Sequence, residues 1–209
     1  MQLRSNDLQD QQAIDPQFAF GRSDGAGQMA LSDNLNPHLV WDQAPEGTRS
    51  FALICVDPDV PSVATHVNQE GHVLAKDMPR VHFFHWSMAN IPASVREIQR
   101  GACSQGVSLG GKQTPEGPEG SIQGANDYTH FMAGSELAGQ YFGYDGPCPP
   151  WNDERIHHYH FRVFALDVEQ LELPAGFSGQ NLLAAIEGHI LAQAELVGTY
   201  TLFPAHLAA

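Results

Sequence analysis

The chain has 209 residues, and 42% of them are hydrophobic, which suits one domain with a sizeable core. Its formal net charge is −14 with only ten lysines and arginines, a field that repels nucleic acid and anionic membrane surfaces, so neither is expected as a partner. The three cysteines form no CxxC pair, which argues against a disulfide framework or a structural zinc site and favours a reducing, cytoplasmic setting.

The chain begins with a polar segment. Residues 1–27 are polar and contain glycine, so we expect a loosely held N-terminal arm followed by a single domain over 28–209. The run MQLRSNDLQDQQAIDP has no apolar stretch typical of an export signal, so no signal peptide is expected. The run SFALICVD (50–57) consists of apolar β-formers before a Pro-rich turn. It predicts a buried strand that delivers Asp57 at its end.

The second predicted strand lies between two long segments that predict loops. Residues 62–80 are polar and predict a loop, and RVHFFHWSMANIP (80–92) predicts an aromatic-rich second strand that Pro92 ends. Residues 101–128 are rich in glycine and proline without any periodicity. Loops of this length inside a compact domain are usually functional or mobile.

The C-terminal third contains the only predicted helix. HHYHFRVFAL (157–166) predicts a third strand. Apolar residues recur at helical spacing through 178–198, with Ser178 as a cap and Gly198 as a stop, and GTYTLF (198–203) predicts a closing strand. Strands dominate, so the fold class is mainly β with a C-terminal helix.

The third predicted strand begins with polar rings. Strand side chains alternate between faces, and the odd-numbered side chains from His157 to Ala165 are the more apolar set. We therefore expect them to face the core and the polar even-numbered ones, led by His158, to meet solvent. His157 and Tyr159 then point inward near the edge of the domain, where a pocket can form.

A buried histidine needs a partner. His157 could simply bond a turn carbonyl. If the strands are neighbours, Asp57, His85 and His157 could instead meet at one rim, where the carboxylate raises the pKa of the imidazoles. Charged imidazoles and the Tyr159 hydroxyl would then donate hydrogen bonds to an anion.

Other chemistries are weighed against this one. One carboxylate and two imidazoles also form the ligand set of a facial-triad iron site, and His158 with His160 could hold adventitious nickel or zinc, but no physiological metal or cofactor is expected. Asp59 is interpreted as turn chemistry. Cys148 is a possible reactive thiol, with its pKa lowered by a charged histidine, or a buried filler.

Several separate sequence blocks occur in a characteristic order. They are DPDVP (57–61), HWSMANIP (85–92), GPCPPWND (146–153) and HHYHFRVFALD (157–167), flanked by NLNPHLVWDQAPEGTRSFAL (34–53) and GTYTL (198–202). Together they resemble one family over residues 30–203, the phosphatidylethanolamine-binding proteins, also called Raf-kinase-inhibitor-like proteins, in their bacterial YbhB/YbcL-like branch. The resemblance implies a PEBP-like β-sandwich with a large central sheet, Greek-key connections and a C-terminal helical segment.

The resemblance also implies a small pocket for phosphate, phosphoethanolamine head groups or acetate-like ions. Carried over position by position, the pocket residues are Asp57, His85, Pro149, Pro150, His157 and Tyr159. Two departures stand out. The segments near 62–80 and 101–128 are insertions that could cover the pocket mouth, and His158 replaces the usual arginine, so we expect anion binding to improve as histidine protonates.

The expected function is that of a small-anion or phospholipid-head-group binding protein that is not an enzyme. The resemblance implies a regulatory or inhibitor role toward a kinase or protease, and a homodimer. Two alternatives stay open: a hydrolase of phosphoesters or carboxyl esters that uses the His/Asp pocket, and a protein-interaction module with a vestigial pocket. No nucleophile is evident for the hydrolase.

Overall fold

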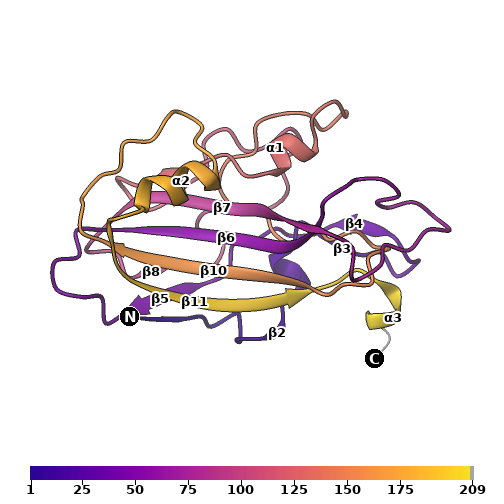
Figure 1. The fold of residues 1–209 in the computed structure, drawn as a ribbon, viewed down its shortest axis with the longest axis horizontal. Coiled ribbons are helices and arrows are strands. Elements are labelled where there is room, and N and C mark those ends of the chain that lie inside the picture. The colour runs from indigo at the N-terminus through magenta and orange to yellow at the C-terminus, as the bar shows by residue number, and fades with distance from the viewer. Residues whose placement is uncertain (208–209) are drawn as a thin grey trace.

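The computed structural model describes residues 1–207 and is built around a six-stranded sheet (Figure 1). Its strands are, in spatial order, β2 (Gln12–Ala13), β11 (Ile190–Tyr200), β10 (His157–Leu166), β6 (Ser50–Pro61), β7 (Arg80–Pro92) and β9 (Ile122–Gln123). All neighbours are antiparallel except β2 and β11, which run parallel. The mainly-β sandwich predicted from the sequence is confirmed.

Smaller elements complete the domain. The remaining strands form a three-stranded sheet of β1 (Gln2–Arg4), β5 (Leu39–Asp42) and β8 (Glu97–Ile98), and a hairpin of β3 (Gly21–Ser23) and β4 (Met29–Leu31). The helical segments are a 3-10 turn, η1 (Pro16–Phe18), and three α-helices, α1 (Tyr128–Phe131), α2 (Gly179–Ile186) and α3 (Pro204–Leu207). No helix within residues 1–207 is long and apolar enough to cross a membrane.

Alternation along the central strands creates a core on each face of the large sheet. On β6, Leu53 and Cys55 join the cluster that includes the small sheet, whereas Ala52 and Ile54 join the cluster beneath α2. In Figure 1, α2 lies over β7 and β6 on one side of the sheet. A strand buried on both faces needs apolar residues at successive positions, and SFALICV supplies them.

Two predicted strands have the observed bounds, and the face assignment of β10 is correct. The side chains of the odd-numbered set are fully buried, while the polar even-numbered side chains are partly exposed. The even-numbered residues at the end of β10, Phe164 and Leu166, are buried against the α2 side. The outward face of β10 is therefore polar where the strand begins and buried where it ends.

The predicted N-terminal arm is wrong, because residues 1–27 belong to the domain. β1 pairs with β5, and β2 pairs with β11. The apolar side chains that hold this segment against the core are Leu3, Leu8, Ile14, Phe18 and Phe20. They are too irregularly spaced among polar residues to give a helical or strand period, so the sequence pattern concealed them.

The predicted helix over 178–198 is correct only in its first half. Ser178 caps α2 through a reciprocal bond with Asn181, as predicted, but the helix ends at Ile186 and Gly188 turns the chain at φ 84°. The rest joins β11, whose backbone pairs with β10 along its length. That pairing outweighs the helical spacing of the apolar residues, and it places Ala192, Ala194 and Leu196 toward the core.

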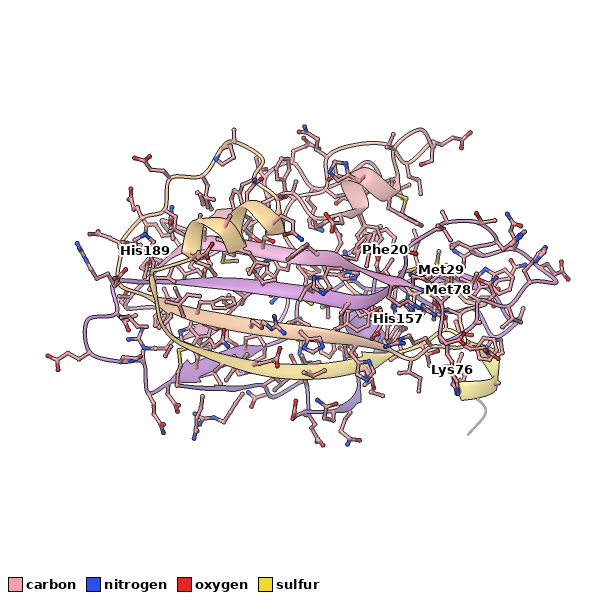
Figure 2. All side chains as sticks on the ribbon, viewed as in Figure 1. Phe20, Met29, Lys76, Met78, His157 and His189 are labelled. Atoms are coloured by element: carbon pink, nitrogen blue, oxygen red, sulfur yellow. The ribbon has the colours of Figure 1, made fainter. Side chains whose placement is uncertain are left out.

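The closing strand predicted over 198–203 is the last part of β11, which ends at Tyr200. Helical spacing would place His189 on the apolar stripe of the predicted helix. It lies instead in the turn between α2 and β11, and its Nδ1 is 2.9 Å from Asp167 Oδ1. Figure 2 shows His189 at the end of the sheet opposite His157.

Candidate functional site

A cavity of about 280 Å³ lies at the end of the large sheet where β10 begins. Phe20, Met29 and His157 mark this end in Figure 2. The six residues assigned to one pocket from the sequence all line the cavity: Asp57, His85, Pro149, Pro150, His157 and Tyr159. Their predicted convergence is therefore observed, while their binding of a ligand stays a prediction.

His157 is held between two carboxylates. Its Nδ1 lies 2.6 Å from Asp57 Oδ2 and its Nε2 lies 3.2 Å from Asp153 Oδ2, and all three side chains are buried. Burial lowers the pKa of this histidine, but the charges and hydrogen bonds of Asp57 and Asp153 outweigh burial and raise the pKa to about 9. Both ring nitrogens of the resulting imidazolium donate to carboxylates, so the expected bond from His157 to an anion is not available.

Further groups stabilise the two carboxylates, a guanidinium at Asp153 and a backbone N–H at Asp57. Arg80 donates two hydrogen bonds to Asp153, at 2.5 and 3.0 Å, and the Asp57 Oδ1 atom accepts the backbone N–H of Asp59 at 2.7 Å. Asp59 accepts from Arg155 Nε at 2.6 Å. This network alternates in sign, and its buried groups satisfy one another, as buried charges must.

His85, on β7, differs from His157. Its Nδ1 lies 2.8 Å from the Asp145 carbonyl oxygen, whereas its Nε2 is buried without a hydrogen-bond partner. Burial lowers the pKa of His85, and the nearby carboxylates only partly oppose this effect, so the ring is neutral rather than charged as expected. The Asp145 carboxylate is fixed by Asn34, Asn126 and Lys112 at 2.7, 2.8 and 2.6 Å.

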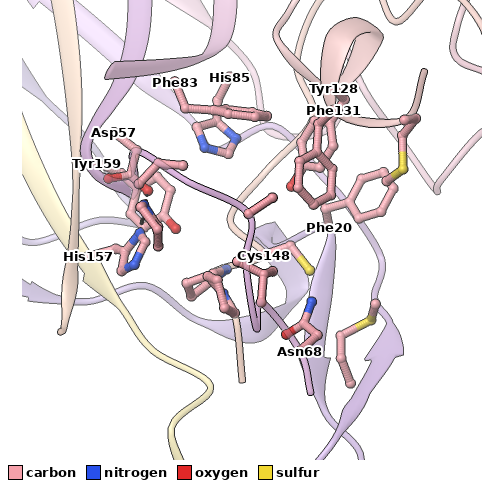
Figure 3. Close-up of a pocket in the computed structure, with 18 of the residues that line it drawn as sticks. Phe20, Asp57, Asn68, Phe83, His85, Tyr128, Phe131, Cys148, His157 and Tyr159 are labelled. Carbon is pink, nitrogen blue, oxygen red and sulfur yellow. Dashed lines mark hydrogen bonds and ion pairs between the residues drawn. The ribbon is translucent and has the colours of Figure 1, made fainter. Parts of the chain in front are cut away.

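Tyr159 supplies a second open group. Its hydroxyl is fully buried without a hydrogen-bond partner, and burial raises its pKa well above the ordinary value. Its ring centroid is 5.1 Å from that of His85. Figure 3 shows Tyr159 on one side of the cavity and the rings of Phe20, Tyr128 and Phe131 on the other. Most of the remaining lining is apolar.

Cys148 lines the cavity beside Pro149 and Pro150, but it does not have the properties of an activated thiol. Burial of the sulfur raises the pKa of Cys148 to about 12, opposite in direction to the predicted lowering by a charged histidine. The imidazolium of His157 is engaged by its two carboxylates. Gly21 leaves space for the sulfur, since a Cβ there would lie only 2.5 Å from Cys148 Sγ.

The histidine pair suggested as an adventitious metal site is bonded elsewhere. His158 Nδ1 lies 2.8 Å from Asp59 Oδ2, and His160 Nδ1 lies 2.8 Å from Glu195 Oε1. The Pro-rich turn predicted after Asp57 is not observed, because β6 continues through Asp59 to Pro61. Asp59 therefore joins a charged network with Arg155 and His158 from within the strand. Among residues 1–207, no group of three or more His, Cys, Asp or Glu side chains is placed to hold a metal ion.

The segment 62–79 borders the cavity, as expected of an insertion at the pocket mouth. Its backbone is fastened by the buried side chain of Asn152. The Nδ2 atom of Asn152 donates to the carbonyls of His66 and His72 at 2.8 and 3.0 Å, and its Oδ1 accepts the N–H of Asn68 at 2.9 Å. We refer to these bonds as the Asn152 clasp.

Several site residues escaped the sequence analysis. Asp145 contacts Asn34, which is distant in sequence. Asp153 contacts His157 only four residues away, and this spacing is the one local signal that could have identified it. Tyr128 follows the GAND segment of the 101–128 loop, and no local pattern marks its inward position. Phe20 belongs to the segment predicted as an arm, although it lines the cavity.

Comparison with known proteins gives a consistent result. The family model described as phosphatidylethanolamine-binding protein matches residues 4–201. YbhB of Escherichia coli is 30% identical over 96% of this chain and all of its own length, and a UPF0098 protein of Aquifex aeolicus is 36% identical over 80% of this chain and 74% of its own.

The crystal structure of YbcL from Escherichia coli, a member of the mammalian PEBP family, is also similar. It superposes with a TM-score of 0.69 at 28% identity, covering 96% of this chain and 97% of that one. The resemblance seen in the sequence is confirmed, and the chain belongs to the phosphatidylethanolamine-binding protein family, in the branch of YbhB and YbcL.

Proposed function

We propose that the chain is a binding protein for small phosphoryl compounds of the phospholipid-head-group class. One observation carries the proposal: the His85 Nε2 and Tyr159 Oη atoms are buried without a hydrogen-bond partner, and both residues line the same cavity. Unpaired buried polar groups are costly, so a ligand that pairs them gains binding energy that the free protein lacks. The apolar lining suits the carbon part of such a ligand.

The proposed role is regulatory rather than catalytic. Ser62 and Cys148 line the cavity, but within residues 1–207 neither side chain is hydrogen-bonded to a histidine, and burial raises the pKa of Cys148 to about 12. A hydrolase that forms a covalent intermediate needs a side-chain nucleophile in contact with its base. The hydrolase alternative requires turnover of phosphoethanolamine, which phosphate release would detect.

The inhibitor role toward a kinase or protease, the homodimer and the cytoplasmic location are part of the same proposal. They rest on membership of the family and on the composition of the chain. A homodimer at micromolar concentration is expected to give twice the monomer mass in light scattering.

Calorimetric titration with phosphoethanolamine tests the binding function. The wild-type protein is expected to bind, and His85→Ala to lose at least about 1 kcal/mol of binding free energy, because the ligand loses one hydrogen bond in a buried site. His82→Ala is the matched control, since His82 is an exposed histidine on the same strand. Absence of binding to the wild type, or equal binding by His85→Ala, would move the assignment to a protein-interaction module.

A further inference from the structure

The open nitrogen of His85 accepts hydrogen bonds and does not donate them. The Asp145 carbonyl carries no proton, so the 2.8 Å contact places the hydrogen of the neutral ring on Nδ1. The Asp145 N–H also bonds the His85 carbonyl at 3.0 Å, which fixes strand and segment to each other. Nε2 therefore carries the lone pair of a residue that lines the cavity, and a ligand that pairs this atom must bring the proton for the bond.

Tyr159 has the complementary requirement. Its hydroxyl carries a proton, which needs an acceptor once water is displaced. An ammonium group has donors only, so it would satisfy His85 and leave the Tyr159 proton unpaired. A single ligand group with one donor and one acceptor satisfies both atoms.

The cavity offers no spare positive charge for a doubly charged ligand. No lysine or arginine of residues 1–207 lines it. The nearby cations are already paired: Arg80 with Asp153, Lys112 with Asp145, and His157 with its two carboxylates. A dianion would bring two charges without a counter-charge where the singly protonated form brings one, so the desolvation cost of the dianion is much larger.

From this donor and acceptor pattern we infer that the cavity selects a phosphate monoester in its singly protonated form. The P–OH group donates to His85 Nε2, and a phosphoryl oxygen accepts from Tyr159 Oη. This inference rests on the proposed function and narrows it. The phosphodiester of an intact phospholipid carries no such proton, so the released monoester head group is the preferred ligand, and a fully deprotonated monoester is rejected.

Ligand ionisation then sets the pH dependence. The second pKa of a phosphate monoester is about 6, so the singly protonated form is about half of the ligand at pH 6 and about 1% at pH 8. Burial lowers the pKa of His85, whereas that of His157 is raised to about 9, so both shifts move the titration of the rings away from the middle of this pH range. The titratable groups that face His85 are Asp57 from β6, His157 and Tyr159 from β10, and Asp127, Tyr128 and Asp145 from the segments packed on β7.

The test is calorimetric titration of the wild-type protein with methyl phosphate, methyl sulfate and dimethyl phosphate at pH 6 and at pH 8. Methyl phosphate is expected to bind about fifty-fold more weakly at pH 8 than at pH 6, in proportion to its protonated fraction. Methyl sulfate matches it in size, dimethyl phosphate is larger by one methyl group, and neither has a proton to donate. They are expected to bind at least about a hundredfold more weakly at pH 6.

Each outcome decides the question. Methyl sulfate binding as tightly as methyl phosphate, or methyl phosphate binding equally well at both pH values, overturns the selection while the proposed binding function stands. Failure of phosphoethanolamine and of all three probes to bind at either pH overturns both. Titration of distant histidines would alter methyl sulfate binding as well, so the ratio of the two ligands isolates the proton of the phosphate.

Substitution of His85 is expected to weaken the preference for methyl phosphate over methyl sulfate. His85→Gln replaces a fixed acceptor with an amide that can turn either its oxygen or its N–H group toward the ligand. The ratio of methyl phosphate to methyl sulfate affinity at pH 6 is expected to fall by at least about tenfold. An unchanged ratio in a folded variant would show that His85 does not read the proton, and the ligand series on the wild type decides the inference independently.

Discussion

The start of β10 and the middle of β7 each bring one buried histidine to the same cavity, and the two are satisfied to different degrees. His157 donates from both nitrogens to carboxylates that have further partners of their own. His85 uses one nitrogen and leaves the other open. Burial and residue type are the same at the two positions. The number of bonds completed inside the protein separates a histidine that holds the site together from one that is free to meet a ligand.

The largest expected effect is on stability and tests whether His157 holds the site together. His157→Ala leaves Asp57 and Asp153 buried without the charge between them, and we expect a loss of about 3–5 kcal/mol in unfolding free energy. His85→Ala removes one bond to a carbonyl and is expected to cost about 1–2 kcal/mol. Urea unfolding at pH 7 measures both. A larger loss in His85→Ala than in His157→Ala would invert the comparison.

A second effect depends on pH and follows from the charge of His157. Its pKa in the folded protein is raised to about 9, above the ordinary value of about 6.5. The stabilisation is therefore complete below about pH 6.5 and is lost as the pH rises through about 9, in total about 3 kcal/mol. The difference in unfolding free energy between wild type and His157→Ala is expected to shrink by that amount between pH 6 and pH 10. A constant difference would mean that His157 is not held as a cation.

The smallest expected effect on stability tests whether the unpartnered groups of the cavity are free to bind a ligand. Tyr159→Phe removes a hydroxyl that has no partner, so the unfolding free energy is expected to stay the same or rise by less than about 1 kcal/mol, while phosphoethanolamine binding weakens. Tyr144→Phe is the matched control. Its buried hydroxyl donates to the Phe18 carbonyl at 2.6 Å, and losing that bond is expected to cost about 1 kcal/mol. Equal costs in the two variants would mean that Tyr159 has an internal partner.

The sequence predicts what depends on local pattern. The strands 80–92 and 157–166 could be placed because continuous β-formers and a two-residue alternation are visible without the fold. The six cavity residues were found through the family blocks, and the structure brings them together. Convergence of three strands at one rim is a long-range property that spacing alone does not contain.

The errors have the same physical origin. The charge states of His157 and His85 depend on Asp153 and on the Asp145 carbonyl, which only the fold brings near. The strand at 190–200 reads as helix because its apolar residues fit both periods, and pairing with β10 decides between them. The first 27 residues look unattached because their few apolar side chains find partners only in distant strands.

The Asn152 clasp allows the side chains at the cavity mouth to change without changes in the sheet, because it holds the mouth by its backbone. One side chain fastens the 62–79 segment by its backbone carbonyls and an N–H, which every amino acid except proline supplies, so the clasp places little demand on the side chains it holds. The exposed side chains of the segment can therefore vary while the strands below remain unchanged, whereas Asn68, whose Oδ1 accepts the Trp151 N–H, and buried Leu74 are held in place. Libraries confined to 62–79 with Asn68, Leu74 and Asn152 retained are a direct route to new ligand preferences on this scaffold.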